Sequence, residues 1–404
     1  MSDHHHDQDH DHDDLSDKTP LELAREELEA SPRFIDLIDT NFHQNGVLYP
    51  GEALARALAD YPRLRPYAPD PRGMPAARAA VAEYYRGRGL DVAPEHIIIT
   101  ASASESYNLL FNRMLEHDQL VALPRPVYPL FEIIAEFNQL GVAHYTLNLD
   151  AGAQPDPAQL RGEIPPEAGL LVAISPNNPT GTRLRRESLE ALIEVARDRS
   201  LPILFDEVFS EFVFPGGPDD SPHVSPAELA DDVLCITLNG VSKMFACPDL
   251  KVSWMLVSGP EDLREELLSV LEIANDMYLN ASSVSQAVLP RLFAEGRRFQ
   301  TWMIREVADR RDRCLRAVAD TSHLEPVVPD GGIHCILRVR DGRGRPVTED
   351  DEDLAVRILR ETGVYTHPGY LYDLEEETAL VVSFLKEPDA LEEGLGRITR
   401  WFAR

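Results

Sequence analysis

Two lysines stand eight residues apart in the stretch from Leu238 to Lys251. They are unusual because the 404-residue sequence contains only four lysines, the others being Lys18 and Lys386, and otherwise uses arginine as its strong base. A guanidinium cannot lose its proton in a protein, so only lysine offers a neutral amine that condenses with a carbonyl group. Lys243 or Lys251 is therefore a candidate imine-forming nucleophile, the alternative at either position being a solvated surface lysine.

Short apolar runs alternate with amphipathic helical segments through the middle of the chain, which predicts an α/β fold. Because each run is continuously apolar, we expect strands that are buried on both faces of a mostly parallel sheet flanked by helices. The expected strands cover Ile97–Thr100, Leu120–Leu123, Leu170–Ile174, Ile203–Phe205, Val233–Leu238 and Val252–Val257.

Polar motifs directly follow these runs, at the strand ends where ligands bind in such sheets. Four of them are Pro124-Arg-Pro-Val-Tyr128-Pro, Ser175-Pro-Asn177-Asn178-Pro-Thr-Gly181, Asp206-Glu207 and Ser242-Lys243. A fifth runs from Ser102 to Glu105 and reads as a capping box that opens a helix. The free N–H groups of such a helix start suit a phosphate, although an ordinary helix cap is the alternative.

The alternation of short apolar runs and helical segments ends near residue 283, which predicts a second domain. Arginine-rich helical stretches run to about Ala319, followed by a strand, a helix, a strand and a terminal helix. We expect an N-terminal helix and arm at 21–60, a large domain at 61–283 and a smaller C-terminal α/β domain at 284–404. Residues 1–20 are rich in His and Asp, and we expect a disordered tail that binds metal loosely or was added as an affinity tag.

The net charge, the apolar runs and the cysteines limit which binding partners and which cellular compartment we expect. The formal net charge of −30 makes nucleic acid and anionic membranes unlikely partners. No run of about 18 apolar residues predicts a membrane helix. The four cysteines are widely spaced, which argues against a zinc site or a disulfide framework and predicts a cytoplasmic protein without a metal.

Taken together, the motifs resemble those of the class I/II aminotransferases, the fold-type I enzymes that use pyridoxal 5′-phosphate (PLP). The resemblance covers roughly residues 40–400 and keeps the family's order and spacing of motifs. It implies a large domain with a mixed, mostly parallel sheet, a smaller C-terminal α/β domain, and a homodimer with shared active sites. It also implies an amine or amino acid and a 2-oxo acid as substrates.

The resemblance implies a role for each motif residue. Lys243 would form the internal aldimine with PLP and shuttle the substrate's proton, and Asp206 would pair with the pyridinium nitrogen. Asn178 would donate to the phenolic oxygen, and Tyr128 would stack on the ring. The phosphate would be held by the residues Ser102, Ala103, Ser104, Lys251 and, from the neighbouring subunit, Tyr67.

Four positions depart from the family's usual pattern. Lys251 stands where arginine is usual, Phe209 where a tyrosine binds the phenolic oxygen, and Gly240 where a serine or threonine is common. Val381 occupies the place of the arginine that grips the substrate carboxylate. Either another group holds the carboxylate, or the substrate has none at Cα. The candidate replacements by motif neighbourhood are Arg72, His43, Asn45, His367 and Tyr370.

The resemblance predicts an aminotransferase that acts on an amino acid or a related amine. Two alternatives stay open. One is a PLP-dependent lyase, decarboxylase or oxidase on the same scaffold, because the sequence does not show which Cα bond is broken. The other is a non-catalytic PLP-binding sensor.

Overall fold

An eight-stranded sheet forms the larger part of the computed structural model, which describes residues 18–59, 61–64, 68–214, 224–277, 279, 281–374 and 376–404. Only β9 and β5 run against the direction of the other strands. In spatial order the strands are β2 (Ile97–Thr100), β9 (Ser253–Ser258), β8 (Cys235–Gly240), β7 (Ile203–Asp206), β6 (Ala168–Ile174), β3 (Leu120–Arg125), β4 (Gly141–Asn148) and β5 (Gln154–Pro155). The predicted mixed, mostly parallel sheet is confirmed.

All six expected strands belong to this sheet, but β4 and β5 were not expected. β4 lies near the edge and alternates between exposed and buried residues toward its end. It therefore lacks the continuous apolar run by which the central strands were found.

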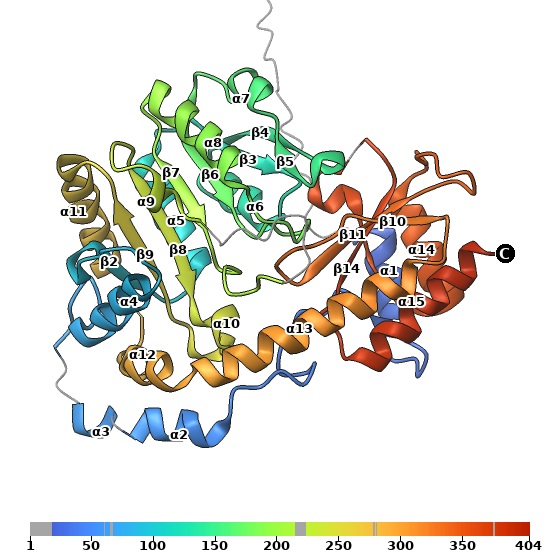
Figure 1. The fold of residues 1–404 in the computed structure, drawn as a ribbon, viewed down its shortest axis with the longest axis horizontal. Coiled ribbons are helices and arrows are strands. Elements are labelled where there is room, and N and C mark those ends of the chain that lie inside the picture. The colour runs from blue at the N-terminus through green and yellow to red at the C-terminus, as the bar shows by residue number, and fades with distance from the viewer. Residues whose placement is uncertain are drawn as a thin grey trace, which may run out of the picture.

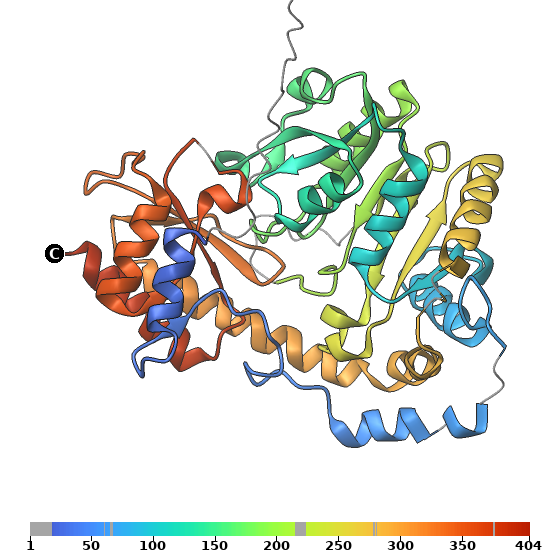
Figure 2. The ribbon, with the colours of Figure 1, turned by 180° about the vertical axis from the view of Figure 1, so that it is seen from behind.

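Helices cover both faces of the large sheet (Figures 1 and 2). Side chains of α5 (Ala103–Met114), α6 (Leu130–Phe137) and α11 (Glu261–Met277) pack on one face. The other face is covered by α7 (Pro157–Glu163), α8 (Arg186–Arg199), α9 (Pro226–Leu229), α4 (Pro75–Gly87) and α12 (Ser283–Glu295). The short η1 (Pro94–His96) leads from α4 into β2, whereas η2 (Leu149–Ala151), α10 (Val241–Met244) and η3 (Pro248–Leu250) lie in connections between strands.

A four-stranded antiparallel sheet forms the smaller C-terminal part, as the resemblance implied. Its order is β10 (Leu324–Pro326), β11 (His334–Val339), β14 (Ala379–Ser383) and β13 (His367–Pro368). One face packs on α13 (Arg297–Val318), α14 (Asp351–Thr362) and α15 (Pro388–Phe402), and the short η4 (Gly369–Tyr372) follows β13. The other face carries a small apolar cluster that includes Ile336 and Val381.

The N-terminal segment contacts both parts of the fold. β1 (Ile35–Asp36) pairs with β12 (Val364–Tyr365), and α1 (Pro20–Leu28) lies among the C-terminal helices in Figure 1. By contrast, α2 (Gly51–Ala59) packs against α12, with α3 (Tyr61–Leu64) beside it. The domain boundaries near residues 20, 60 and 283 stay predictions, and residues 1–17 of the expected tail lie outside the described residues.

No helix in the described part of the chain has both the length and the apolar character that crossing a membrane requires.

Candidate active site

A cavity of about 400 Å³ lies between the two sheets, at the carboxyl ends of the large sheet's central strands. The predicted site residues Ser102, Ala103, Ser104, Tyr128, Asn178, Asp206, Lys243 and Lys251 all line this cavity. The structure therefore brings together eight residues that are spread over 150 positions of the sequence. The ninth, Tyr67, lies outside the described residues.

One end of the cavity is built to receive an anion. The twelve-residue helix α5 begins there at Ala103, with Ser102 as its N-cap. The Ser102 hydroxyl accepts a hydrogen bond from the Glu105 N–H at 3.0 Å, but the Glu105 carboxylate accepts from the N–H of Ala101 rather than of Ser102. Only half of the expected capping box is therefore present. The helix N-terminus and the ammonium group of Lys251 both place positive charge at this end.

The hydroxyl missing at Gly240 is supplied from the neighbouring strand. Gly240 on β8 pairs with Ser253 on β9, and both residues line the cavity. A Cβ atom on Gly240 would lie 2.3 Å from the Ser253 Oγ, so that hydroxyl already fills the space. Sequence reasoning missed Ser253 because its position depends on the cross-strand pairing of β8 and β9.

Asp206 is a buried carboxylate at the end of β7, 3% exposed. It accepts hydrogen bonds from the Tyr107 hydroxyl at 2.9 Å and from the Val208 N–H at 3.0 Å. Because burial penalises the charged form, the pKa of Asp206 is raised to about 6, although both hydrogen bonds oppose this. Both donors are neutral, so a cationic ligand in the cavity would stabilise the carboxylate. The role of Tyr107 on α5 was not expected from the sequence.

The amine of Lys243 lies in an apolar part of the cavity. Its Nζ atom is 5.4 Å from the ring centroid of Phe42 and 5.7 Å from that of Phe209. Burial lowers the pKa of Lys243 to about 8. Roughly a tenth of the amine is then neutral at pH 7, far more than for a lysine of ordinary pKa. Phe209 offers no hydroxyl to this part of the cavity.

Tyr128 and Asn178 also line the cavity. Tyr128 is 40% exposed and packs its ring edge to face against Phe131, at 6.1 Å between centroids. The Oδ1 atom of Asn178 is buried and accepts no hydrogen bond from the described residues. The cavity thus offers an aromatic face and an unpartnered amide oxygen to a bound ligand.

The small sheet forms the opposite wall of the cavity. Val381 on β14 is fully buried in the cluster with Ile336 and Tyr372, and it is not among the lining residues. Four side chains of this part of the fold do line the cavity: Ile333, His334, His367 and Tyr372. His334 and Tyr372 were missed in the sequence, where each looks like an ordinary member of a strand or a turn.

Only His367 of the five candidate replacements for the arginine lines the cavity. Arg72 forms an ion pair with Glu272 at 2.8 Å, and the His43 ring bonds the carbonyl oxygen of Ala246. Asn45 holds the N-terminal arm through Asp39 and Asn41, and the backbone N–H of Tyr370 donates to Asp351. The contacts of Arg72, His43 and Asn45 are structural.

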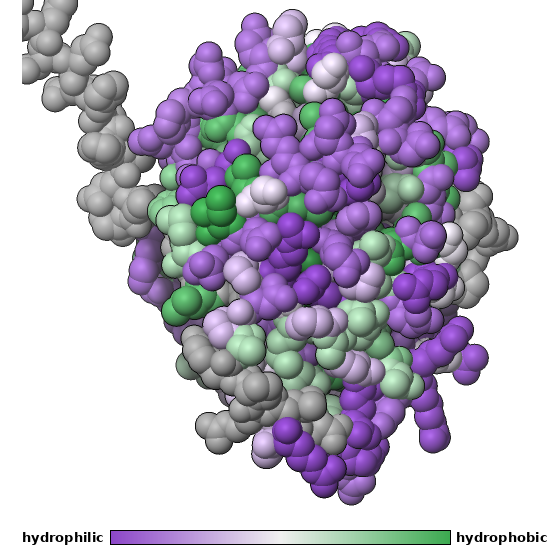
Figure 3. Space-filling model, turned by 90° about the vertical axis from the view of Figure 1, so that its left-hand side faces the viewer, coloured by the Kyte–Doolittle hydropathy of each residue, from purple (hydrophilic) through white to green (hydrophobic). Residues whose placement is uncertain are grey.

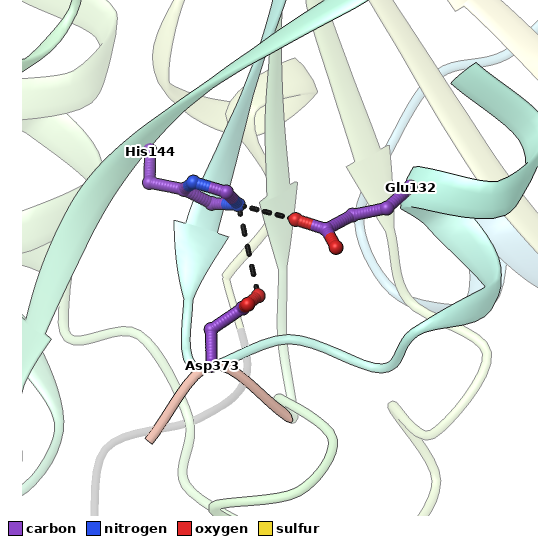
Figure 4. A group of neighbouring side chains, drawn as sticks. All are labelled: Glu132, His144 and Asp373. Carbon is purple, nitrogen blue, oxygen red and sulfur yellow. Dashed lines mark hydrogen bonds and ion pairs between the residues drawn. The ribbon is translucent and has the colours of Figure 1, made fainter. Parts of the chain in front are cut away.

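A cluster of charged side chains holds the turn that carries Tyr372 (Figure 4). His144 on β4 places its Nε2 atom 2.7 Å from Glu132 Oε1 and 3.7 Å from Asp373 Oδ2, and Arg125 donates to its Nδ1 atom at 3.2 Å. Such a trio is a conceivable set of metal ligands, but the guanidinium of Arg125 beside the ring disfavours a second cation. We interpret the cluster as a link between the two parts of the fold.

The sequence matches known proteins along most of its length. A family model described as "Aminotransferase class I and II" covers residues 46–398. The glutamate-pyruvate aminotransferase AlaA of Escherichia coli (strain K12) is 26% identical over 357 residues, which is 88% of this chain and 86% of that protein. The tyrosine aminotransferase of Dictyostelium discoideum is 24% identical over 336 residues, 82% of this chain and 79% of the relative.

The fold matches solved structures equally widely. An aminotransferase from Escherichia coli superposes with a TM-score of 0.85 at 26% identity, over 96% of this chain and 95% of that one. The alanine aminotransferase from Pyrococcus furiosus gives a TM-score of 0.86 over 94% and 95% of the two chains, and its 21% identity makes this a likeness of fold alone. The family match spans well over half of the sequence, and this protein belongs to the class I and II aminotransferases.

Proposed function

We propose that this protein is a PLP-dependent aminotransferase that moves an amino group between an amine and a carbonyl compound, with Lys243 as its catalytic lysine. The observation that carries the proposal is that one cavity contains both a desolvated lysine amine, that of Lys243, and a buried carboxylate, that of Asp206. Similarity to a glutamate-pyruvate aminotransferase makes amino acids such as glutamate and 2-oxo acids such as pyruvate the first substrates to test.

The residues of the cavity fit PLP. Its phosphate suits the α5 N-terminus with Ser102, Ala103 and Ser104, together with Lys251 and the Ser253 hydroxyl. The hydrogen-bond donors to Asp206 among the described residues, Tyr107 and Val208, are neutral, and a protonated ring nitrogen would stabilise its carboxylate. Asn178 lines the cavity, where its amide N–H would donate to the phenolic oxygen, and the exposed face of Tyr128 suits the ring.

The protein groups then have distinct tasks. PLP, when bound, supplies the electron sink for the carbanion at the substrate's Cα. Lys243 takes the proton from Cα, because a pKa of about 8 leaves a usable fraction of neutral amine. Phe42 and Phe209 exclude water from that amine. Asp206 maintains the charge of the ring nitrogen, and Tyr107 orients Asp206.

We also propose a homodimer with shared active sites. The support is the number of large apolar side chains that lie exposed on the described surface, among them Leu48, Ile273, Met277 and Leu279. On the face shown in Figure 3, hydrophobic residues gather in small groups among the hydrophilic ones. Contiguous exposed apolar patches often mark protein interfaces, and the exposed Ile273 and Met277 lie one turn apart on α11. A sedimentation mass equal to one chain of 45.2 kDa would contradict this proposal.

The test of the catalytic assignment is Lys243→Ala. The variant should lose the visible absorption of lysine-bound PLP, and its rate with glutamate or alanine should fall at least about 10³-fold. Lys18→Ala is the matched control, because Lys18 is exposed and paired only with Glu26. A Lys243→Ala protein that retains the visible band would refute the assignment. Ammonia release without conversion of PLP to its amine form would favour the lyase or oxidase alternative.

A further inference from the structure

We infer that the small-sheet wall of the cavity is a specificity site that takes an uncharged substituent at the substrate's Cα. The substituent would be a carboxamide or a hydroxymethyl group, which both donates and accepts a hydrogen bond, in preference to a carboxylate. This inference rests on the proposed aminotransferase function and names the substrate class for it.

The register of the small sheet places two imidazole rings near Val381, the position at which the family usually has an arginine. Val381 on β14 lies directly opposite His367 on β13 and opposite Ile336 on β11. His334 lies two residues before Ile336, on the same face of the sheet. The wall beside Val381 therefore includes the rings of His334, His367 and Tyr372, with the apolar side chain of Ile333 next to His334 in the chain.

His367 and Tyr372 form a pair that offers one donor and one acceptor to the cavity. The Nδ1 atom of His367 lies 3.0 Å from the Tyr372 hydroxyl. If the hydroxyl donates to Nδ1, the pair has an Nε2–H to donate and a hydroxyl oxygen to accept. If Nδ1–H donates instead, the pair has the hydroxyl hydrogen to donate and Nε2 to accept. A carboxamide satisfies both groups in either case, whereas a carboxylate has only acceptors and leaves the protein's acceptor unpaired.

The wall also lacks a positive charge with which to hold a carboxylate. Among the described residues that line the cavity, the only cations are Lys243 and Lys251, which serve the reacting carbon and the anion-binding end. Arg25 lies close to His367 but stacks on Tyr365 at 4.8 Å and is paired with Asp36. An ionised carboxylate buried here would go unpaired, which is costly.

Both imidazoles are neutral at physiological pH. Burial lowers the pKa of His334 to about 3 and that of His367 to about 4. The positive charges nearby, Lys243 for His334 and Arg25 for His367, lower these pKa values further. Neither ring therefore replaces the charge of a guanidinium.

The test compares substrates that differ only at this substituent. Alanine, alaninamide and alaninol are mixed singly with the PLP-loaded enzyme, and conversion of the visible band is followed without an acceptor. Concentrations are expressed as free amine, because the three amines differ in pKa. We expect the ratio of rate to dissociation constant to be at least about tenfold higher for alaninamide and alaninol, which is about 1.4 kcal/mol. A ratio that is equal, or higher for alanine, would overturn the inference.

An equilibrium titration separates binding from turnover. 2-Aminoisobutyric acid and its amide have no hydrogen on Cα, so they shift the PLP spectrum without completing a reaction. The amide should bind at least about tenfold more tightly than the acid, and equal affinities would contradict the inference. If no compound changes the spectrum and Lys243→Ala retains the visible band, the proposed function fails, and this inference with it. If the acids react best, only this inference fails.

Substitutions of His367 and Tyr372 test whether these side chains cause the preference for the amide over the acid. Tyr372→Phe removes one hydroxyl and maintains the ring, and we expect it to reduce the amide-over-acid ratio to about one third or less. His367→Gln retains a donor and an acceptor and should maintain more of the ratio than His367→Phe. His323→Gln is the matched control, because His323 stacks on Phe402 and does not line the cavity. An unchanged ratio in both Tyr372→Phe and His367→Phe would refute the assignment of this wall.

Discussion

The two walls of the cavity are built in opposite ways. The large-sheet wall carries charge: Lys243, Lys251, Asp206 and the positive end of α5 meet there. The small-sheet wall carries polar groups that are neutral, the rings of His334, His367 and Tyr372, above an apolar cluster. The difference teaches that a chain can retain the wall that serves a cofactor while it rebuilds the wall that selects a substrate.

The first prediction tests the small-sheet wall by giving it a charge. Val381→Arg should lower the free energy of unfolding by at least about 3 kcal/mol, because it buries an unpaired cation among Ile336, Tyr372 and Val327. It should also shift the substrate preference toward alanine and away from alaninamide. Chemical denaturation and the spectral titration measure the two effects.

Val381→Met is the control for this change, since it adds length without charge. If Val381→Arg were as stable as Val381→Met and retained the preference for the amide, position 381 would not face this wall.

The second prediction tests how the large-sheet wall holds its charge. PLP binding requires ionised Asp206, so it should weaken as the pH falls through about 6. Tyr107→Phe removes a hydrogen bond that lowers this pKa, so the acid limb of PLP binding should move up by about one pH unit. Titration of the apoprotein with PLP between pH 5 and 8 measures the shift.

The raised pKa of Asp206 also has a defined effect on the stability of the apoprotein. The folded chain binds this proton more tightly than the unfolded chain, so the stabilisation is complete below about pH 4 and is lost as the pH rises through about 6. Tyr145→Phe is the control for Tyr107→Phe, because its buried hydroxyl donates to the carbonyl oxygen of Val172. Equal acid limbs in the two variants would show that Tyr107 does not act on Asp206.

The smallest effect is expected at the anion-binding end. Lys251→Arg should leave the dissociation constant of PLP unchanged or improve it by no more than about threefold, because Lys251 is exposed and its ion pair is screened by water. Fluorescence titration measures this, and Lys251→Ala should bind PLP more weakly than either. A loss of more than about tenfold in Lys251→Arg would mean that the site is shaped around an ammonium group.

The same contrast explains what could be predicted from the sequence. The order of the central strands' apolar runs predicted the sheet. The polar motifs beside those runs predicted eight residues that line one cavity, because most of the motifs begin where a strand ends; their roles toward PLP stay predictions. Tyr107, Ser253, His334 and Tyr372 were not predicted. Ser253 and His334 reach the cavity through strand register, and Tyr107 and Tyr372 through the docking of a helix and a turn. These depend on three-dimensional packing that no short stretch of sequence records.

The close packing of the Ser253 hydroxyl against Gly240 makes the order of mutations at these two positions matter. A chain with serine at position 240 first meets the Ser253 side chain, 2.3 Å from the new Cβ to Oγ and 3.0 Å to Cβ. The path through Ser253→Gly followed by Gly240→Ser avoids that crowded intermediate, whereas the reverse order passes through it. The two positions are therefore epistatic, because Gly240→Ser is disfavoured while the Ser253 side chain is present and this crowding is relieved by Ser253→Gly.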